Sequence, residues 1–341
     1  SIYEGIAKLP PGSFVTVDMA GRAGGPAPYW SAAEQAAEAA GQLFAGGEDE
    51  AIAEVGRLLR HSVDRRMVAD VPLGAFLSGG IDSSLVVALM RAGGRPVKTF
   101  TIGFPDWTQD EAPHAAAVAR HLGTDHTEVP LTEQDCLDLI PNLSSIYDEP
   151  FADPSQLPTA LLCRATRPHV TVALSGDGGD ELFGGYPRYT AAEREWHKVA
   201  ATPMALRHTA RGLTSMLRGT EWRPLRRLRR KLQPYTRQSA ELLYRDYLSW
   251  WSDEDGLMRQ PIAVSDQYSQ PGALTRIQPL AARFMALDAA AYLPDDLETK
   301  IDRASMAVSL ETRAPMLQAD LAAFAWSLPL SMKVRPTHGK H

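Results

Sequence analysis

The stretch from Ser78 to Ser84 reads Ser-Gly-Gly-Ile-Asp-Ser-Ser and joins hydroxyl side chains, glycines and one carboxylate. It lies between an apolar segment and a second one of helical length, so we predict a turn from a strand into a helix. Amides of such a turn and of the helix N-terminus point at one spot, which favours an anion such as phosphate. Asp82 would repel that anion unless Mg²⁺ lay between them. The stretch therefore predicts a site for a phosphate ester with Mg²⁺, and without a lysine it is not a Walker A loop.

A second turn, rich in glycine and acidic residues, runs from Ser175 to Tyr186. It follows the apolar segment Val170 to Leu174 directly, and its glycines again let the backbone approach a ligand. Asp180 could bind the same Mg²⁺ as Asp82, because Mg²⁺ commonly takes one or two carboxylates together with phosphate oxygens. Aspartate and glycine are also ordinary turn residues, and that simpler interpretation is the alternative.

The segments around these turns alternate between strand and helix patterns. Such alternation predicts a parallel sheet with right-handed crossovers, whose ligands bind at the carboxyl ends of the strands. Ser78, the loop after Ile102 and the loop after Leu174 should therefore surround one crevice. Strands are expected at Val71–Leu77, Val97–Gly103, Asp125–Val129 and Val170–Leu174, and helices at Leu85–Met90, Glu111–Leu122, Leu137–Ile146 and Leu157–Ala165.

The rest of the chain has a different pattern. From Pro187 onward the strand signals end, and helices are expected at Gln238–Trp251 and Pro279–Ala291. Upstream, Ile6–Asp18 predicts a turn and a strand that has no sheet of its own to join. We therefore predict an α/β fold in three parts: residues 1–30 as the end of another domain, residues 31–186 as a nucleotide-binding domain with a parallel sheet, and residues 187–341 as a helical subdomain.

Length, charge and composition limit the classes of function that the chain can have. The chain has 341 residues and a net charge of −6, which allows two domains and argues against a general nucleic-acid binder. No segment is long and apolar enough to span a bilayer, so we expect a cytoplasmic protein without a membrane partner. Cys136 and Cys163 have no metal-binding or redox spacing and are predicted to be buried thiols.

One basic run, from Arg223 to Lys231, lies inside the helical part. Its simpler interpretation is the solvated face of a helix, because charged helical faces usually point to water. The sharper interpretation is a patch that binds nucleic acid or phosphate groups. The sequence leaves both interpretations open.

Five stretches carry a resemblance to a known family. Ser78 to Ser84 resembles the pyrophosphate-binding loop S-G-G-x-D-S-S of the ATP pyrophosphatase superfamily. Ser175 to Tyr186 is similar to the block S-G-[DE]-G-x-D-E-x-F-G-G-Y in the synthetase domain of glutamine-dependent asparagine synthetases. Tyr147 to Ser155 and Ser305 to Pro315 resemble two further segments of that family, and Ile2 to Asp18 resembles the closing strands of its glutaminase domain. The resemblance covers nearly the whole chain in family order.

The resemblance implies cleavage of ATP to AMP and pyrophosphate, with an acyl-adenylate formed on a carboxylate and opened by ammonia from glutamine. It implies that Asp82 and Asp180 hold Mg²⁺ and that Asp177 is needed to form the acyl-adenylate. The resemblance also assigns the binding of the phosphates and of the adenosine to two groups of residues. The β- and γ-phosphates are assigned to Ser78, Gly79, Gly80, Asp82, Ser83 and Ser84, and the adenosine to the main chain near Phe76, Leu77, Ile102, Ser175 and Gly176.

Three departures from the family stand out. The glutaminase nucleophile is an N-terminal cysteine, whereas this chain begins with Ser1. The family continues past the L-K-V-R stretch to a lysine that assists amide formation, and Lys340 is expected to lie too early to replace it. Gln318 stands where the family usually has aspartate. We therefore expect a fragment, truncated at both ends, in which residues 1–30 are a remnant of the glutaminase domain.

The expected function is ATP-dependent amidation of a carboxylate, with aspartate as the first acceptor to test. One alternative is an amidotransferase for a sugar acid or a peptide carboxylate. Another is a tRNA-modifying enzyme with the same phosphate loop, which the basic run could serve, although a nucleic-acid partner is not expected. A third is a nucleotide-binding module without catalysis. A homodimer is left open.

Overall fold

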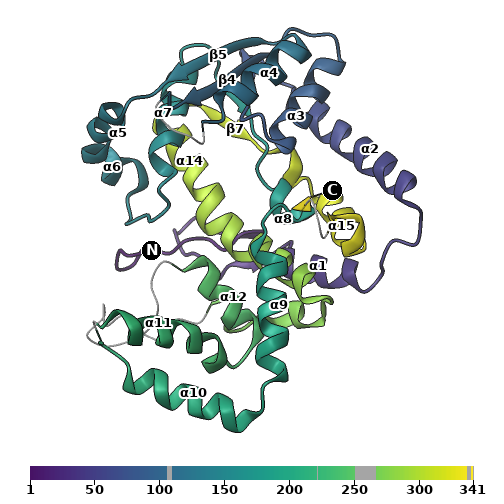
Figure 1. Ribbon diagram of the computed structural model, residues 1–341. Helices are drawn as coiled ribbons and strands as arrows, with labels where there is room; N and C mark the ends of the chain where they lie inside the picture. Colours follow the sequence, from purple (N-terminus) through teal and green to yellow (C-terminus); the bar gives the residue numbers. More distant parts are fainter. Residues whose placement is uncertain (106–109, 221, 250–265, 336–338, 341) are drawn as a thin grey trace.

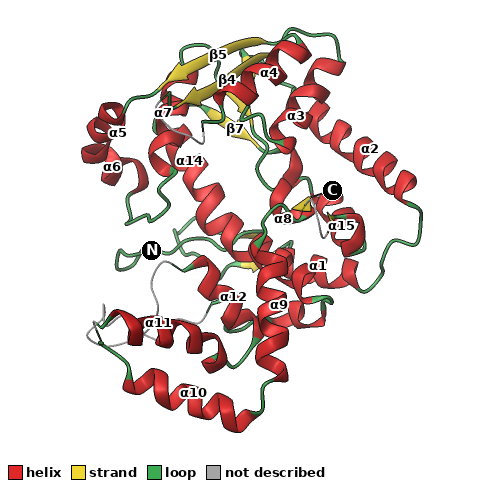
Figure 2. Ribbon diagram, in the orientation of Figure 1, coloured by secondary structure: helices red, strands yellow, loops and turns green. Residues whose placement is uncertain are grey.

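A five-stranded parallel sheet with the strand order β5-β4-β3-β6-β7 forms one end of the molecule (Figures 1 and 2). The computed structural model describes residues 1–105, 110–220, 222–249, 266–335 and 339–340. The mixed α/β architecture with a parallel sheet confirms the predicted fold class. The strands are β3 (Leu73–Phe76), β4 (Lys98–Gly103), β5 (Asp125–Pro130), β6 (Val172–Leu174) and β7 (Glu311–Arg313).

Helices cover both faces of this sheet because successive strand residues point to opposite sides. Val172 and Leu174 of β6 pack with apolar residues of the helices α2, α3 and α4. Ala173, between them, packs on the other face with residues of α7 and α14. These helices are α2 (Glu48–Arg66), α3 (Ile81–Ala92), α4 (Ala112–Leu122), α7 (Gln156–Thr166) and α14 (Thr299–Met306).

Strand β7 corrects the expectation that strand signals end at Pro187. The main-chain N–H of Ser175 donates to the carbonyl of Arg313, and that of Glu311 donates to Thr171. Glu311-Thr312-Arg313 is short and polar and has no apolar alternation, so only its pairing with β6 makes it a strand. Residues far along the chain therefore complete the sheet, and the boundary at residue 187 stays a prediction.

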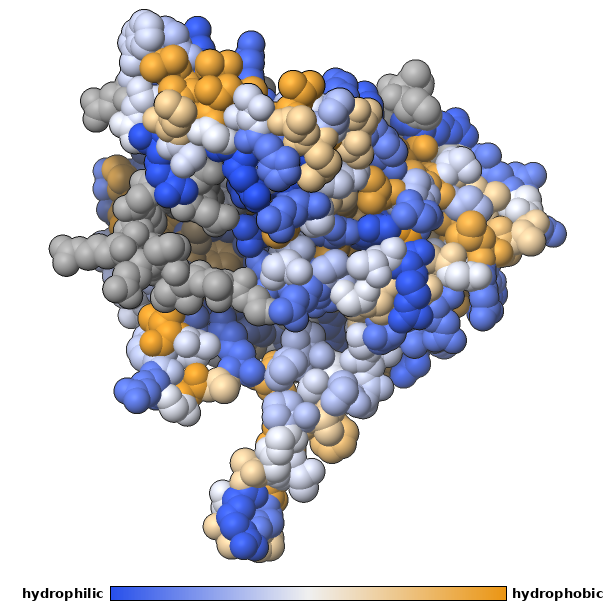
Figure 3. All heavy atoms as spheres, turned by 90° about the horizontal axis from the view of Figure 1, so that it is seen from below, coloured by the Kyte–Doolittle hydropathy of each residue, from blue (hydrophilic) through white to orange (hydrophobic). Residues whose placement is uncertain are grey.

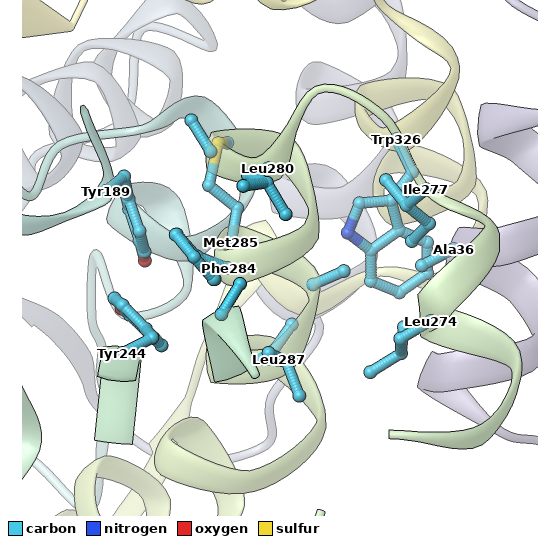
Figure 4. Close-up of a cluster of buried hydrophobic side chains, with 14 of the residues drawn as sticks. Ala36, Tyr189, Tyr244, Leu274, Ile277, Leu280, Phe284, Met285, Leu287 and Trp326 are labelled. Atoms are coloured by element: carbon cyan, nitrogen blue, oxygen red, sulfur yellow. The ribbon is translucent and has the colours of Figure 1, made fainter. Parts of the chain in front are cut away.

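A second core lies among the helices below the sheet (Figure 4). Tyr189 of α9, Tyr244 of α12 and Phe284 of α13 stack in its centre. Trp30 stacks on Trp326 at its edge, so residues near the N-terminus pack on α15 near the C-terminus. The elements of this core are α1 (Ala32–Ala40), α9 (Arg188–Ala201), α12 (Ala240–Leu248), α13 (Leu280–Leu287) and α15 (Ala319–Ser327).

The remaining elements are short or peripheral. Helices α10 (Met204–Met216) and α11 (Arg223–Leu232) lie at the end of the molecule opposite the sheet (Figure 1). The predicted strand near residues 6–18 is reduced to β1 (Ser13–Phe14), paired with β2 (Ala27–Pro28). The others are α5 (Glu133–Leu139), α6 (Leu143–Tyr147), α8 (Gly179–Phe183), β8 (Val334–Arg335) and β9 (Gly339–Lys340).

Two further predictions can be checked against the described residues. Cys163 is buried, as predicted, whereas Cys136 is only half-buried, and both are free thiols. Among the described residues, no helix has the length and apolar character needed to cross a membrane.

Candidate active site

The first turn joins β3 to α3, as predicted, and its shape is fixed by its own serines. Ser83 Oγ lies 2.9 Å from Ser78 Oγ and accepts a hydrogen bond of 3.2 Å from the Ser78 amide. Gly79 has a φ of +79°, in the left-handed region that favours glycine. Gly80 is the N-cap of α3 and provides no side-chain cap, so the first amides of α3 face the turn without a side-chain acceptor of their own. This arrangement suits an anion.

The second turn, between β6 and α8, packs directly against the first. A Cβ atom on Gly176 would lie 2.8 Å from the amide nitrogen of Ser83, and one on Gly179 would clash with the Asp82 carboxylate. Glycine is therefore required at both positions for the turns to approach this closely. The predicted meeting of the two turns at neighbouring strand ends is confirmed.

Both turns open into one cavity of about 1040 Å³, which we call the active-site cavity. It is also bordered by α9, through Tyr189, Glu193 and Arg194, and by Val334 and Arg335 of β8. Of the residues predicted to form the site, those that line it are Ser78, Gly80, Asp82, Ser83, Gly176, Asp177 and Asp180.

The other predicted site residues do not line the cavity. Phe76, Leu77, Ile102 and Ser175 lie at or just after the ends of the strands β3, β4 and β6, and the Leu77 amide donates to the carbonyl of Phe100. Gly79 packs against α4 instead. The Ser84 hydroxyl is buried and has no hydrogen-bond partner among the described residues. The roles given to these residues in binding adenosine and phosphate remain predictions.

The residues present fit a Mg²⁺ ion that also binds phosphate oxygens. Asp82 and Asp180 line the same cavity, and each carboxylate rests against a glycine, Gly179 and Gly185 respectively, where a Cβ would displace it. Within the described ranges, no group of three or more histidine, cysteine or acidic residues could hold a metal. Two carboxylates suffice for Mg²⁺ only if a ligand supplies the remaining oxygens. The site therefore suits a metal that arrives with a polyphosphate.

Other carboxyl groups lie near Asp82 and Asp180. The sequence analysis assigned no role to two of them, Glu181 and Glu298. Burial raises the pKa of Glu181 to about 7, and burial together with Asp177 and Glu181 raises the pKa of Glu298 to about 7. Burial also raises the pKa of Asp177, although a hydrogen bond from Ser175 and the charge of Lys300 oppose it. Glu181 and Glu298 therefore gain or lose protons near neutral pH, which is the range in which a general acid or base works best.

An ion pair joins two segments that are distant in the sequence. Lys300 Nζ lies 2.6 Å from Asp153 Oδ2 and 2.7 Å from Ser155 Oγ. Burial acts to raise the pKa of Asp153, but the hydrogen bonds from Lys300 and Ser155 outweigh it and lower the pKa. Asp153 and Ser155 belong to the segment Tyr147 to Ser155 that resembles the family, whereas no pattern in the sequence indicated Lys300 as their partner.

An unusual helix follows α13. Residues Asp288–Glu298 form a π-helix between α13 and α14, with Pro294 inside it. Asp288, which is fully buried, accepts hydrogen bonds from Arg188 (2.6 Å) and Tyr244 (2.7 Å). Single π turns are frequent at functional sites because they change the direction in which side chains point. The sequence indicated an ordinary helix over Pro279–Ala291, so this feature was missed.

A second cavity, of about 530 Å³, is bordered by Arg188. Its walls include Asp153, Asp295 and Asp296, together with the rings of Tyr247 and Tyr292. We call it the acidic cavity.

The last described residues reach the rim of the active-site cavity. Val334, which lines the cavity, pairs with the main chain of Lys340 in the β8–β9 hairpin. The expectation that Lys340 lies too early to act stays a prediction. Gln318, the departure noted in the sequence, accepts a 2.9 Å hydrogen bond from Arg66 Nη1 and does not line the cavity.

Comparison with known proteins shows which family the chain resembles. The family model described as "Asparagine synthase" matches residues 54–341. A putative asparagine synthetase (glutamine-hydrolyzing) of Mycobacterium tuberculosis is 32% identical over 302 residues, which cover 84% of this chain and 44% of that relative. Asparagine synthetase 1 (glutamine-hydrolyzing) of Bacillus subtilis is 29% identical over 297 residues, covering 84% and 45%.

A putative asparagine synthetase 2 (glutamine-hydrolyzing) of Methanocaldococcus jannaschii is more similar over a shorter region. It is 48% identical over 137 residues, which cover 40% of this chain and 26% of that relative. The chain thus spans less than half the length of these curated relatives.

Proposed function

The chain belongs to the asparagine synthase family, and from that premise we propose that it activates a carboxylate with ATP and converts it to an amide. The proposed acceptor is aspartate, and the proposed nitrogen source is ammonia released from glutamine. The names of the relatives, which are asparagine synthetases described as glutamine-hydrolyzing, support both choices.

One observation carries this proposal. Two glycine-rich turns at the ends of β3 and β6 meet so closely that Gly179 lies against Asp82, and both turns open into the active-site cavity. One turn offers the amides and hydroxyls that suit an anion, and the other offers carboxylates. A nucleotide triphosphate with its Mg²⁺ is a ligand that needs both.

The chemistry follows from this placement. A carboxylate oxygen of the acceptor attacks the α-phosphorus of ATP, and the bond to the β-phosphate oxygen breaks, which gives an acyl-adenylate and pyrophosphate. The N-terminal amides of α3 and the hydroxyls of Ser78 and Ser83 stabilise the charge that the leaving pyrophosphate gains. Ammonia then attacks the carbonyl carbon, and AMP leaves with the former carboxylate oxygen. The proton that ammonia loses goes to a carboxylate with a raised pKa, for which we propose Asp177.

Asp82 and Asp180 are the residues proposed to hold Mg²⁺. When bound, the ion would offset negative charge on the phosphate oxygens. The two carboxylates keep their positions because the adjoining glycines leave room for them.

The proposal is tested by pyrophosphate release. The full chain is incubated with ATP, Mg²⁺, ammonium and one carboxylate from a panel that begins with aspartate and includes glutamate, a sugar acid and a peptide. Supplying ammonium directly makes the readout independent of glutamine hydrolysis, and parallel samples with glutamine test that source. We expect pyrophosphate and AMP in equal amounts, formed only when a suitable carboxylate is present. Formation of ADP and orthophosphate would contradict the proposal.

A further inference from the structure

The basic run found in the sequence forms one wall of a cleft. Six of the ten residues of α11 are arginine or lysine, and none is acidic. Three of them, Arg227, Arg230 and Lys231, border a cavity of about 1010 Å³ whose opposite wall is α9, with Arg194 and Lys198. We call this cavity the basic cleft. Half of the cations of α11 therefore border one space together with two cations of α9, while their side chains stay exposed.

These cations are not used to hold the fold. Within the part of the chain that the structure describes, none of the five cations of the basic cleft forms an ion pair within 4 Å. Arg207 of α10 shows the contrast, because it lies over the Trp196 ring at 5.8 Å and donates a hydrogen bond to the carbonyl of Tyr235. Like charges three or four residues apart repel along a helix, so the composition of α11 opposes its own stability. An anionic ligand would remove that repulsion.

The basic cleft adjoins the active-site cavity. Arg194 borders both spaces, and its Nε–H donates a 3.1 Å hydrogen bond to the carbonyl of Thr190, which aligns the side chain along α9. The two spaces therefore meet at Arg194. The remaining walls are Ala191, Pro234, Tyr235, Tyr247, His197 and Glu195. The Glu195 carboxylate accepts a 2.6 Å hydrogen bond from the Tyr247 hydroxyl, so the cleft holds one acidic group among its five cations.

We infer that the basic cleft binds an acidic peptide segment and that one carboxylate of this peptide can replace free aspartate as the acceptor in the active-site cavity. This inference rests on the proposed function for the reaction itself. It adds peptides to free aspartate as acceptors, because the cations of the cleft offer a site for further carboxylates of the same ligand.

The surroundings favour a short acidic peptide over a nucleic acid. Tyr247 borders the basic cleft and also the acidic cavity, which carries Asp153, Asp295 and Asp296. A long polyanion that ran on from the cleft would meet these carboxylates, while a short segment would end before them. The net charge of −6 likewise confines positive potential to a small region. In Figure 3, which views the molecule from the end that carries α10 and α11, hydrophilic residues lie interspersed with hydrophobic ones.

Binding is measured by fluorescence anisotropy with the full chain and a labelled peptide of glutamate residues. The test variant combines Arg227→Glu, Arg230→Glu and Lys231→Glu. Its matched control combines Arg60→Glu, Arg65→Glu and Arg95→Glu, which are exposed arginines outside the cleft with the same change in charge. Thermal unfolding checks that both variants fold. We expect the test variant to bind about a hundredfold more weakly at low salt, and the control to bind like the wild type. A glutamine peptide of equal length should not bind.

The outcomes separate this inference from the proposed function. No binding to the wild type, or equal weakening in both variants, overturns the acidic-peptide inference, even if aspartate supports pyrophosphate release. Tighter binding of a short single-stranded RNA than of the peptide, lost in the test variant, also overturns it and assigns the cleft to nucleic acid. Peptide binding that depends on the cleft, without pyrophosphate release from any carboxylate, supports the cleft as a peptide site and rejects the proposed reaction.

Discussion

The active-site cavity and the basic cleft have nearly the same size, about 1040 and 1010 Å³, and they share Arg194. Their construction differs. The first is built from turns at strand ends, where glycines and half-buried carboxylates are held by the backbone. The second is built from long cationic side chains on α9 and α11, and α11 has no buried residue. Backbone-built sites tolerate little displacement, whereas a cleft of long side chains can adapt to its ligand. Four predictions separate the two sites further.

The largest expected effect concerns the carboxylates of the active-site cavity. Asp82→Ala and Asp180→Ala each remove a proposed metal ligand and should lower the rate of pyrophosphate release on the order of 10³-fold. Asp64→Ala, at an exposed position of α2, is the matched control and should be as active as the wild type. Normal turnover in either test variant would remove that aspartate from the metal site. Far-ultraviolet circular dichroism verifies that the fold is retained.

A smaller loss is expected from one added methyl group. In Gly179→Ala the new Cβ would occupy the place of the Asp82 carboxylate, so the carboxylate must move. Displacement of about 1 Å in an active site can lower the rate about 10²-fold. Gly56→Ala is the control, because its Cβ would meet nothing within 4 Å. This control lies inside α2 and should stabilise the fold by about 0.5 to 1 kcal/mol without loss of activity. Equal activity of the two variants would show that the close approach of the turns is not needed.

The third effect depends on pH. Burial raises the pKa of Glu181 to about 7 from an ordinary 4.5, so the folded protein binds this proton more tightly than the unfolded chain does. Stability is therefore lost as the pH rises from about 4.5 to 7, and the loss is complete above pH 7. Glu181→Gln removes the titration. Its free energy of unfolding, compared with that of the wild type, should rise by about 2 kcal/mol between pH 5 and pH 8. A difference independent of pH, measured by urea unfolding, would mean that Glu181 has an ordinary pKa.

The smallest effect belongs to the basic cleft. The combined Arg227→Glu, Arg230→Glu and Lys231→Glu variant should change the free energy of unfolding by less than about 0.5 kcal/mol, because exposed substitutions seldom do more. Urea unfolding measures the difference directly. Destabilisation by several kcal/mol would show that these residues hold α11 in place, which would remove the contrast between the two sites.

Local patterns in the sequence predicted the two turns that line one side of the active-site cavity. Hydroxyls, glycines and carboxylates at fixed spacing after apolar segments placed Ser78, Asp82, Asp177 and Asp180 correctly at strand ends, because this information lies within a few residues. The alternation of strands and helices likewise gave four of the five strands of the sheet.

What the sequence could not give depends on contacts between distant segments. β7 is a strand only because it pairs with β6, and Lys300 meets Asp153 across 147 positions of sequence. The π-helix Asp288–Glu298 has no periodicity that distinguishes it from an α-helix over so short a length. The raised pKa of Glu298 results from burial by several segments, so its chemical interest was visible only in the folded protein. The same holds for the basic run, whose convergence with α9 no local pattern could indicate.

The most direct test of the central claim follows one oxygen atom. The chain is given ATP, Mg²⁺, ammonium and aspartate whose side-chain carboxylate is labelled with ¹⁸O, and the nucleotide products are analysed by mass spectrometry. If the carboxylate attacks the α-phosphorus, AMP must carry one labelled oxygen, unlabelled pyrophosphate must accompany it, and Asp82→Ala must abolish both. Label in orthophosphate together with ADP, or AMP without label, would contradict an acyl-adenylate and with it the function proposed for the two glycine-rich turns.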